Sequence, residues 1–222
     1  LHHSDIRQGI KMGNMNVIDH MIFDALTDAY TGVHMGVTAE NIAKKFNISR
    51  EEQDRFAYQS QLKAIKAVDA GEFDDEIVPI KIKDKKNEFD FARDEYPNRT
   101  TNLEKLASLR PAFVKEGTVT AGNASGINDG ASFLLVASEE AVAKYHLTPL
   151  VEVVGIGQGG VDPQVMGLGP VPAIHNALAY AHMKLSDIDV IELNEAFAAQ
   201  SIGVVKSLAL EHGVSEEAIY AK

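Results

Sequence analysis

After residue 130 the sequence alternates short apolar runs with stretches of helical periodicity, and this alternation constrains the fold most. Continuous apolar runs of this length are typical of strands that are covered on both faces. Three runs are expected to form strands, at 132–137, 150–155 and 190–193. Stretches of helical periodicity predict helices at 139–145, 171–184 and 195–211. Strands that alternate with helices predict a layered α/β core.

The first 125 residues have a different character and are expected to be an insertion into that core. Ser49 and Glu52 form a capping box that predicts the start of a long helix, and Gly71 is its expected end. Thr38 is the expected N-cap of a shorter helix before it. Alternating apolar and polar residues predict two solvent-edged strands, at 77–82 and 88–91.

Composition excludes several classes of function. The chain of 222 residues carries a net charge of −11, which argues against binding to a nucleic-acid backbone. It contains no apolar run long enough to span a membrane and no signal-peptide stretch at its start, so the cytoplasm is the default compartment. It contains no cysteine, which excludes a disulfide, a thiolate metal site and a cysteine nucleophile on this chain.

Two patterns that suggest a cofactor or a metal lack the context that such sites need. Gly155, Gly157 and Gly160 follow an expected strand as Gly-x-Gly-x-x-Gly. A dinucleotide-binding turn leads directly into a helix, whereas Pro163 intervenes here, so we interpret the glycines as a strand-end loop. The eight histidines show no His-Glu-x-x-His pattern, and we expect no metal site.

Three loops carry residue types that suit a ligand site. His34 precedes Met35 and Gly36, where a ligand could approach the backbone closely; the alternative is a structural histidine. The segment 117–130 is rich in small residues and either lies against a ligand or is an ordinary connection. Asn194 stands between an expected strand and an expected helix, where open α/β folds place their sites, but Asn is also a favoured N-cap.

Five segments, in their order and spacing, resemble the biosynthetic thiolases. They are His34 to Asn41, Leu109 to Phe113, Gly117 to Ala131, Val165 to Pro170 and Asn194 to Gln200. The resemblance covers essentially the whole chain, which is similar to the middle part of a longer family member. It implies an α/β, thiolase-like fold, only partly present, in which layered α/β/α halves carry an inserted loop domain that binds coenzyme A.

The resemblance also implies a division of the chain. The loop domain would comprise residues 1–127, the closing segment of the N-terminal half residues 128–147, and the first part of the C-terminal half residues 148–222. The parent enzyme would be a homodimer or a homotetramer without a tightly bound cofactor, and its substrates would be acetyl-CoA and acetoacetyl-CoA. No nucleic-acid or membrane partner is expected.

Individual roles follow from the same resemblance. Asn194 matches the family Asn that orients a water, and this water helps to stabilise the enolate of acetyl-CoA. Other positions match residues that contact coenzyme A or line the acyl pocket: Leu26, His34, Met35, Phe113, Ala121, Ser125, Gly126, Met166, Ala196 and Phe197. Family members often have an Arg that contacts the nucleotide, but it stands one position earlier than Arg99 does in this chain.

In the family, one Cys takes the acyl group from a thioester and a second Cys deprotonates acetyl-CoA. By resemblance, the first Cys belongs before residue 1, and the second Cys and the His of a Gly-His-Pro motif belong after residue 222. The chain is therefore predicted to be inactive alone.

Three interpretations stay open at this point. The chain is part of an acetyl-CoA C-acetyltransferase, which condenses two acetyl-CoA to acetoacetyl-CoA and coenzyme A or catalyses the reverse thiolysis. Alternatively, it is a catalytically dead acyl-CoA-binding chain or a decayed gene product. A structural or nucleic-acid role has in its favour only the lysines at 81, 83, 85 and 86, which we interpret as a solvated hairpin face.

Overall fold

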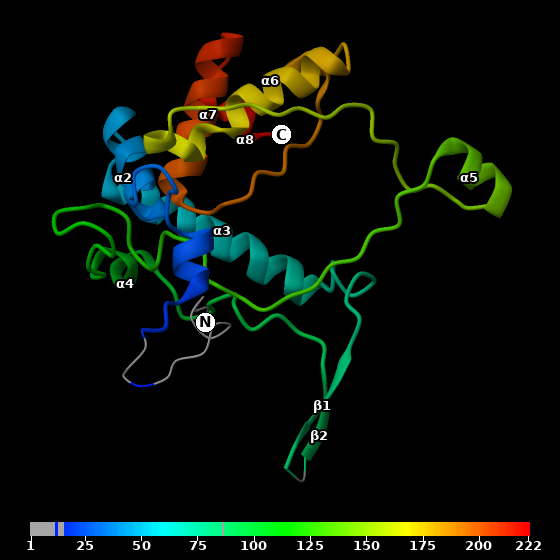
Figure 1. Ribbon diagram of the computed structural model, residues 1–222, viewed down its shortest axis with the longest axis horizontal. Coiled ribbons are helices and arrows are strands. Elements are labelled where there is room, and N and C mark those ends of the chain that lie inside the picture. Colours follow the sequence, from blue (N-terminus) through cyan, green and yellow to red (C-terminus); the bar gives the residue numbers. More distant parts are fainter. Residues whose placement is uncertain (1–11, 13–15, 86) are drawn as a thin grey trace.

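The computed structural model describes residues 12, 16–85 and 87–222. Most of its regular structure is helical, and one hairpin projects from the helical body (Figure 1). The helices are η1 (Met21–Ala25), α2 (Met35–Lys45), α3 (Arg50–Ala70), α4 (Leu103–Ala107), α5 (Glu139–Tyr145), η2 (Pro163–Leu168), α6 (Pro170–Tyr180), η3 (Leu185–Asp187), α7 (Ala198–His212) and α8 (Glu216–Tyr220). The hairpin strands are β1 (Ile80–Asp84) and β2 (Asn87–Phe91).

The long helix α3 begins and ends where its local signals predict. Ser49 Oγ accepts the N–H of Glu52 at 3.1 Å, and the Glu52 carboxylate accepts the N–H of Ser49 at 3.4 Å. At the other end Gly71 adopts φ +72°, a left-handed conformation that glycine reaches without steric cost. The prediction for this helix is confirmed.

The preceding helix, α2, begins earlier than predicted. Its N-cap is His34, whose Nδ1 accepts the N–H of Gly36 at 3.0 Å. Thr38 lies one turn inside the helix, and its hydroxyl donates to the carbonyl of Met35 at 2.6 Å. The prediction of Thr38 as N-cap is wrong. The Nδ1 atom of His34 accepts a hydrogen bond from the first turn, which is the role that was expected for the Thr38 hydroxyl.

The core lies where α2, α7 and η2 meet, with α3, α6 and α8 around them. Ile42 of α2 and Val204 of α7 are completely buried, and Ile202 is 2% exposed. Gly203 allows the two helices to approach, because a Cβ at this position would lie 2.5 Å from Cγ2 of Ile42. Burial of each such aliphatic side chain contributes about 1.5–3 kcal/mol, so this helix contact is a main source of stability.

The three strands predicted after residue 130 are absent from the part of the chain that the structure describes. Segments 132–137, 150–155 and 190–193 are assigned no strand, and the one sheet among the described residues is the β1–β2 hairpin. Phe133 and Leu134 are 93% and 90% exposed, and the connection from α5 to η2 runs as a wide arc beside the helical body (Figure 1). These predictions are wrong because an apolar run indicates burial but does not provide a second strand. A strand forms only when its backbone hydrogen-bonds to such a neighbour.

The other predicted elements form with shifted ends. The hairpin pairs antiparallel from Ile80↔Phe91 to Asp84↔Asn87, which confirms the two expected strands. The helix α5 has the predicted bounds, whereas α6 ends at Tyr180 instead of 184. Among the described helices, none is long and apolar enough to cross a bilayer.

The Gly-x-Gly-x-x-Gly segment packs along α6. A Cβ on Gly155 would lie 2.9 Å from the carbonyl oxygen of Ala177. A Cβ on Gly157 would overlap the carbonyl oxygen of Ala173. No helix starts directly after Gly160, since η2 begins at Pro163. These glycines therefore allow close contact with a helix, and their geometry is not that of a phosphate-binding turn.

Candidate functional site

Two loops that are far apart in the sequence form a short antiparallel pair. Ser125 donates its N–H to the carbonyl of Ala196 at 2.9 Å, and Ala198 donates its N–H to the carbonyl of Asn123 at 2.9 Å. Between these bonds Ala124 and Phe197 form a β-bridge. The small-residue segment and the loop before α7, two of the three ligand-site loops expected from the sequence, therefore lie against each other.

This pairing sets the start of α7. Phe197 is extended, with φ −145° and ψ 142°, and the helix begins at Ala198 rather than at Glu195 as predicted. Asn194 lies upstream of the N-cap position, so the interpretation of Asn194 as an N-cap is wrong. Instead Asn194 is exposed in the loop that leads into the pair.

An aromatic row connects the third loop to the same place. The ring of His34 stacks on Phe113 with 4.8 Å between centroids, and Phe113 meets Phe197 edge to face at 5.9 Å. The carbonyl of Leu26 accepts the N–H of Met35, the residue after His34, at 2.9 Å. Four of the positions predicted to contact coenzyme A, Leu26, His34, Met35 and Phe113, are thus linked to one another. Phe197, predicted to line the acyl pocket, joins them to Ala196 and Ser125.

A pocket of about 190 Å³ opens between α3 and the paired loops. The helix contributes Ser60 and Gln61, the connection after the hairpin contributes Tyr96, and the paired loops contribute Ser125 and Glu195. Next to Ser125, Gly126 is packed so closely that a Cβ there would overlap the Tyr96 ring. Ser125 is therefore the predicted residue that lines the pocket, and Gly126 supports its wall.

Ala121, Asn194 and Met166 are predicted from the sequence, but they take no part in the contacts described above and do not line the pocket. Ala121 is exposed at the tip of the small-residue segment, and Asn194 is exposed as described. Met166 is 55% exposed on η2, which Asn41 joins to α2 through a hydrogen bond to the carbonyl of Gln164 at 2.9 Å.

The wall formed by α3 was not predicted from the sequence. Phe56, Ala57 and Ala64 form an apolar stripe, and Ser60 and Gln61 occupy the same face at helical spacing. Two polar residues within an apolar stripe are the signal that could have identified this wall, because a core-facing stripe has no reason to include them.

Arg99 does not line the pocket. Its guanidinium donates to both carboxylate oxygens of Asp69, at 2.8 and 2.5 Å, and Arg93 donates to the same carboxylate at 3.0 Å. The hydrogen bond from Arg99 holds the pKa of Asp69 below its ordinary value, and the same bond raises the pKa of Arg99. In this conformation the guanidinium is occupied by a carboxylate.

The comparisons with known proteins agree with one another. The family model for the thiolase N-terminal domain matches residues 1–140, and that for the thiolase C-terminal domain matches residues 147–217. A probable acetyl-CoA acyltransferase of Staphylococcus aureus strain COL is 53% identical over 205 residues, which cover 92% of this chain and 52% of that protein.

Solved structures give the same result. The acetyl-CoA acetyltransferase of Bacillus anthracis aligns with a TM-score of 0.86 and 45% identity, covering 93% of this chain and 52% of that one. Human mitochondrial 3-ketoacyl-CoA thiolase in complex with CoA aligns with a TM-score of 0.83 and 46% identity, covering 92% and 51%. The described fold is therefore part of the fold of these proteins, and the chain spans about half the length of the relatives that it matches.

Proposed function

Since the chain belongs to the thiolase family, we propose that it supplies the coenzyme A-binding part of an acetyl-CoA C-acetyltransferase. The reaction joins two acetyl-CoA into acetoacetyl-CoA and coenzyme A, or reverses this by thiolysis. The observation that carries the proposal is the pairing of Ser125 with Ala196, because it closes one side of a pocket with two loops that are far apart in the sequence.

The chemistry of these loops suits a pantetheine thioester. Gly122 and Ala124 line the pocket with little or no side chain, so the amides of an extended ligand can approach main-chain groups closely. Ser125 is exposed toward the pocket and offers a hydroxyl that can donate or accept. In this proposal the pocket beside α3 receives part of coenzyme A, and the aromatic row with His34 and Met35 lies near the thioester end.

Acyl transfer needs groups that these 222 residues do not include. The sequence contains no cysteine, so a thiol nucleophile and a thiol base have to come from other polypeptide. We propose that this chain binds the thioester and does not turn it over alone. In the assembled enzyme Asn194 would orient a water toward the enolate of acetyl-CoA, and loss of such a donor raises the barrier by about 3 kcal/mol.

The remaining expectations belong to the same proposal. Residues 1–127 would act as the loop domain, 128–147 would close the N-terminal half and 148–222 would open the C-terminal half. The assembled enzyme would work in the cytoplasm as a homodimer or homotetramer.

Titration calorimetry with coenzyme A and with acetyl-CoA tests the proposal. The expected result is saturable binding of both ligands without release of free thiol from acetyl-CoA. Ser125→Tyr should fill the pocket and abolish binding, whereas the matched exposed substitution Ser186→Tyr on η3 should leave it intact. Failure of a folded wild-type chain to bind either ligand would refute coenzyme A binding, and turnover of acetyl-CoA would refute the dependence on outside thiols.

A further inference from the structure

We propose that Asp54 is a positioning residue for coenzyme A: its buried carboxylate orients the side-chain amide of Asn123 and thereby shapes the loop that carries Ser125. Asp54 lies on α3, the helix that forms one wall of the pocket, but it does not line the pocket itself. The inference rests on the proposed function for its ligand, and on hydrogen bonds within the chain for its geometry.

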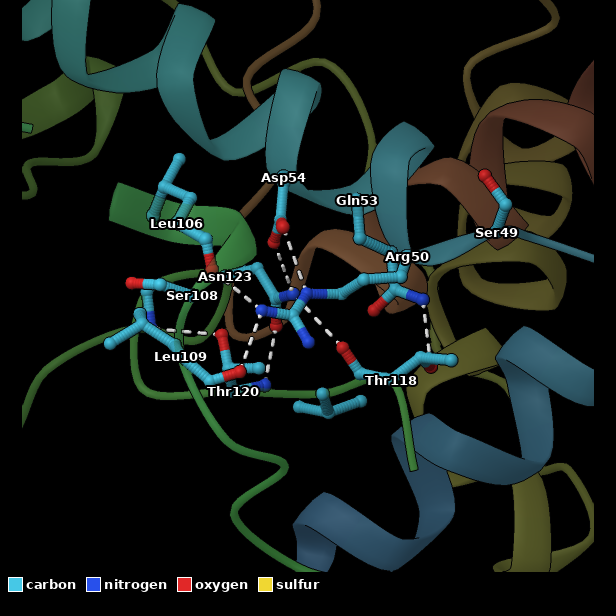
Figure 2. Close-up of polar contacts among 12 residues, drawn as sticks. Ser49, Arg50, Gln53, Asp54, Leu106, Ser108, Leu109, Thr118, Thr120 and Asn123 are labelled. Carbon is cyan, nitrogen blue, oxygen red and sulfur yellow. Dashed lines mark hydrogen bonds and ion pairs between the residues drawn. The ribbon is translucent and has the colours of Figure 1, made fainter. Parts of the chain in front are cut away.

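Asp54 is almost completely buried, with 3% of its surface exposed. One carboxylate oxygen accepts the Nδ2–H of Asn123 at 2.9 Å, and the other accepts the Nε–H of Arg50 at 2.8 Å (Figure 2). A buried carboxylate is costly unless it is paired and hydrogen-bonded, and these two donors meet that requirement. Because a carboxylate only accepts hydrogen bonds, Asn123 has to turn its NH₂ group toward Asp54.

The orientation of this amide closes the loop from Thr118 to Asn123. The Asn123 side-chain oxygen accepts the N–H of Thr120 at 2.8 Å, and its NH₂ group also donates to the carbonyl of Thr118 at 3.1 Å. Asn123 is 2% exposed and Thr120 is completely buried. If the amide were reversed, its oxygen would point at the Asp54 carboxylate and the Thr118 carbonyl, and its NH₂ group would point at the N–H of Thr120. Each contact would then bring together two acceptors or two donors, so the loop shape and the amide orientation depend on each other.

The same residue joins the loop to the start of α7. The Asn123 carbonyl accepts the N–H of Ala198, and two residues later Ser125 donates to Ala196. A displacement of Asn123 would therefore move Ser125 relative to the pocket. Asp54 contacts neither residue directly, and it acts on both through the Asn123 amide.

The partners of Asp54 are themselves held firmly. Arg50 donates from Nη2 to the carbonyls of Leu106 and Leu109, at 2.6 and 3.0 Å, which fixes its guanidinium against the end of α4 (Figure 2). On the other side of the loop, the Glu40 carboxylate accepts the N–H groups of Thr118 and Val119 at 2.9 Å each. With both ends anchored, the orientation of the amide in the middle determines the path of the loop.

The test is Asp54→Asn, which keeps the shape of the side chain and replaces one of its two acceptors with a donor. Arg50 and Asn123 then compete for a single oxygen, and we expect the dissociation constant for coenzyme A to rise about tenfold, equivalent to about 1.4 kcal/mol. The exchanged pair Asp54→Asn with Asn123→Asp restores one donor–acceptor contact, because the new amide can donate to the new carboxylate. Partial recovery of affinity in this double variant is expected.

Lys206→Met is the matched stability control. Lys206 joins Glu52 of α3 to Glu216 of α8, at 3.2 Å each, and neither ion pair involves a residue of the loop. This variant should lower the melting temperature and leave coenzyme A affinity unchanged. Loss of affinity in Lys206→Met equal to that in Asp54→Asn would overturn the inference, because general loosening of α3 would then explain both.

Hydrogen exchange separates this inference from the proposed function. In Asp54→Asn the amides of Ser125 and Ala198 should exchange faster than in the wild type without any ligand present, and unchanged exchange overturns the inference whether or not the chain binds coenzyme A. If the wild type binds and Asp54→Asn binds equally well, the inference fails and the proposed function stands. Should Asp54→Asn not fold, Asp54→Glu moves the carboxylate by one methylene, and unchanged exchange and affinity in that variant would also refute the role.

Discussion

The ring of Tyr220 lies 6.4 Å from the ring of Phe56 and is tilted 51° to it, so the last helix, α8, packs against the helix that forms a wall of the pocket. Phe56 is itself part of the pocket lining. Lys206 adds an ion pair to each of these helices, one with Glu52 and one with Glu216. These contacts join α3 to the end of the chain and add to its stability.

This packing predicts a loss of stability in alkali. Burial, first, and the nearby carboxylates of Glu216, Glu52 and Glu217 together raise the pKa of Tyr220 to about 12. A phenol whose pKa is higher in the folded state contributes stability that is fully present below its unfolded pKa of about 10 and is lost as the pH rises toward about 12. Tyr220 stays 47% exposed, so solvent screens part of the effect.

Urea denaturation over this pH range checks the prediction. The free energy of unfolding of the wild type should fall more steeply than that of Tyr220→Phe, which has no phenol to ionise. Parallel curves for the two proteins would show that the Tyr220 hydroxyl does not contribute.

Gly36→Ala should destabilise the protein by about 1–3 kcal/mol, because the new Cβ would overlap atoms of the Phe113 ring, which stacks on His34. The matched control is Gly130→Ala, since a Cβ at that position meets no atom within 4 Å. Thermal denaturation of both variants measures the difference. Equal melting temperatures would mean that the Phe113 ring moves aside at no cost.

Gly126→Ala should reduce coenzyme A affinity more than it reduces stability. The added methyl group would meet the Tyr96 ring, which is 46% exposed and free to turn, but the turned ring would narrow or reshape the pocket. Calorimetry should show affinity lower by about tenfold, or about 1.4 kcal/mol. If Gly126→Ala binds coenzyme A as tightly as the wild type does, the ligand does not contact the Tyr96 side of the pocket.

Arg99→Ala should change coenzyme A affinity by less than about twofold, or about 0.4 kcal/mol, because the Arg99 guanidinium is already paired with Asp69. Asp69→Ala should instead strengthen binding at low ionic strength, since it leaves Arg99 available to a phosphate. Calorimetry at two salt concentrations compares the two variants. A large loss in Arg99→Ala would mean that Arg99 leaves Asp69 when coenzyme A binds.

The elements that could be predicted from the sequence are those whose signals lie within a few residues. The box at Ser49 and Glu52 and the stop at Gly71 locate α3, and the alternation on either side of residue 86 locates the hairpin. Each signal works because the groups that satisfy one another are near neighbours along the chain. The resemblance to the thiolases also rests on local motifs, and the comparisons confirm it.

Features that depend on contacts between distant segments could not be predicted from the sequence. The apolar run at Phe133 predicts burial, yet strand formation requires a partner that no local pattern supplies. The start of α7 was misplaced because the residues on either side of Phe197 are hydrogen-bonded to the loop around Ala124, which is far away in the sequence. Ser60 was overlooked because its importance appears only when α3 faces that loop.

Residue types and their short-range order established both ends of α3, the turn-rich loop, the absence of a thiol and the family to which the chain belongs. The contacts between distant segments established which loops meet, where the pocket opens and that Asp54 orients the amide of Asn123. The physical reason is that a cap is satisfied within one helical turn, whereas a buried carboxylate accepts hydrogen bonds from whichever donors folding brings within about 3 Å.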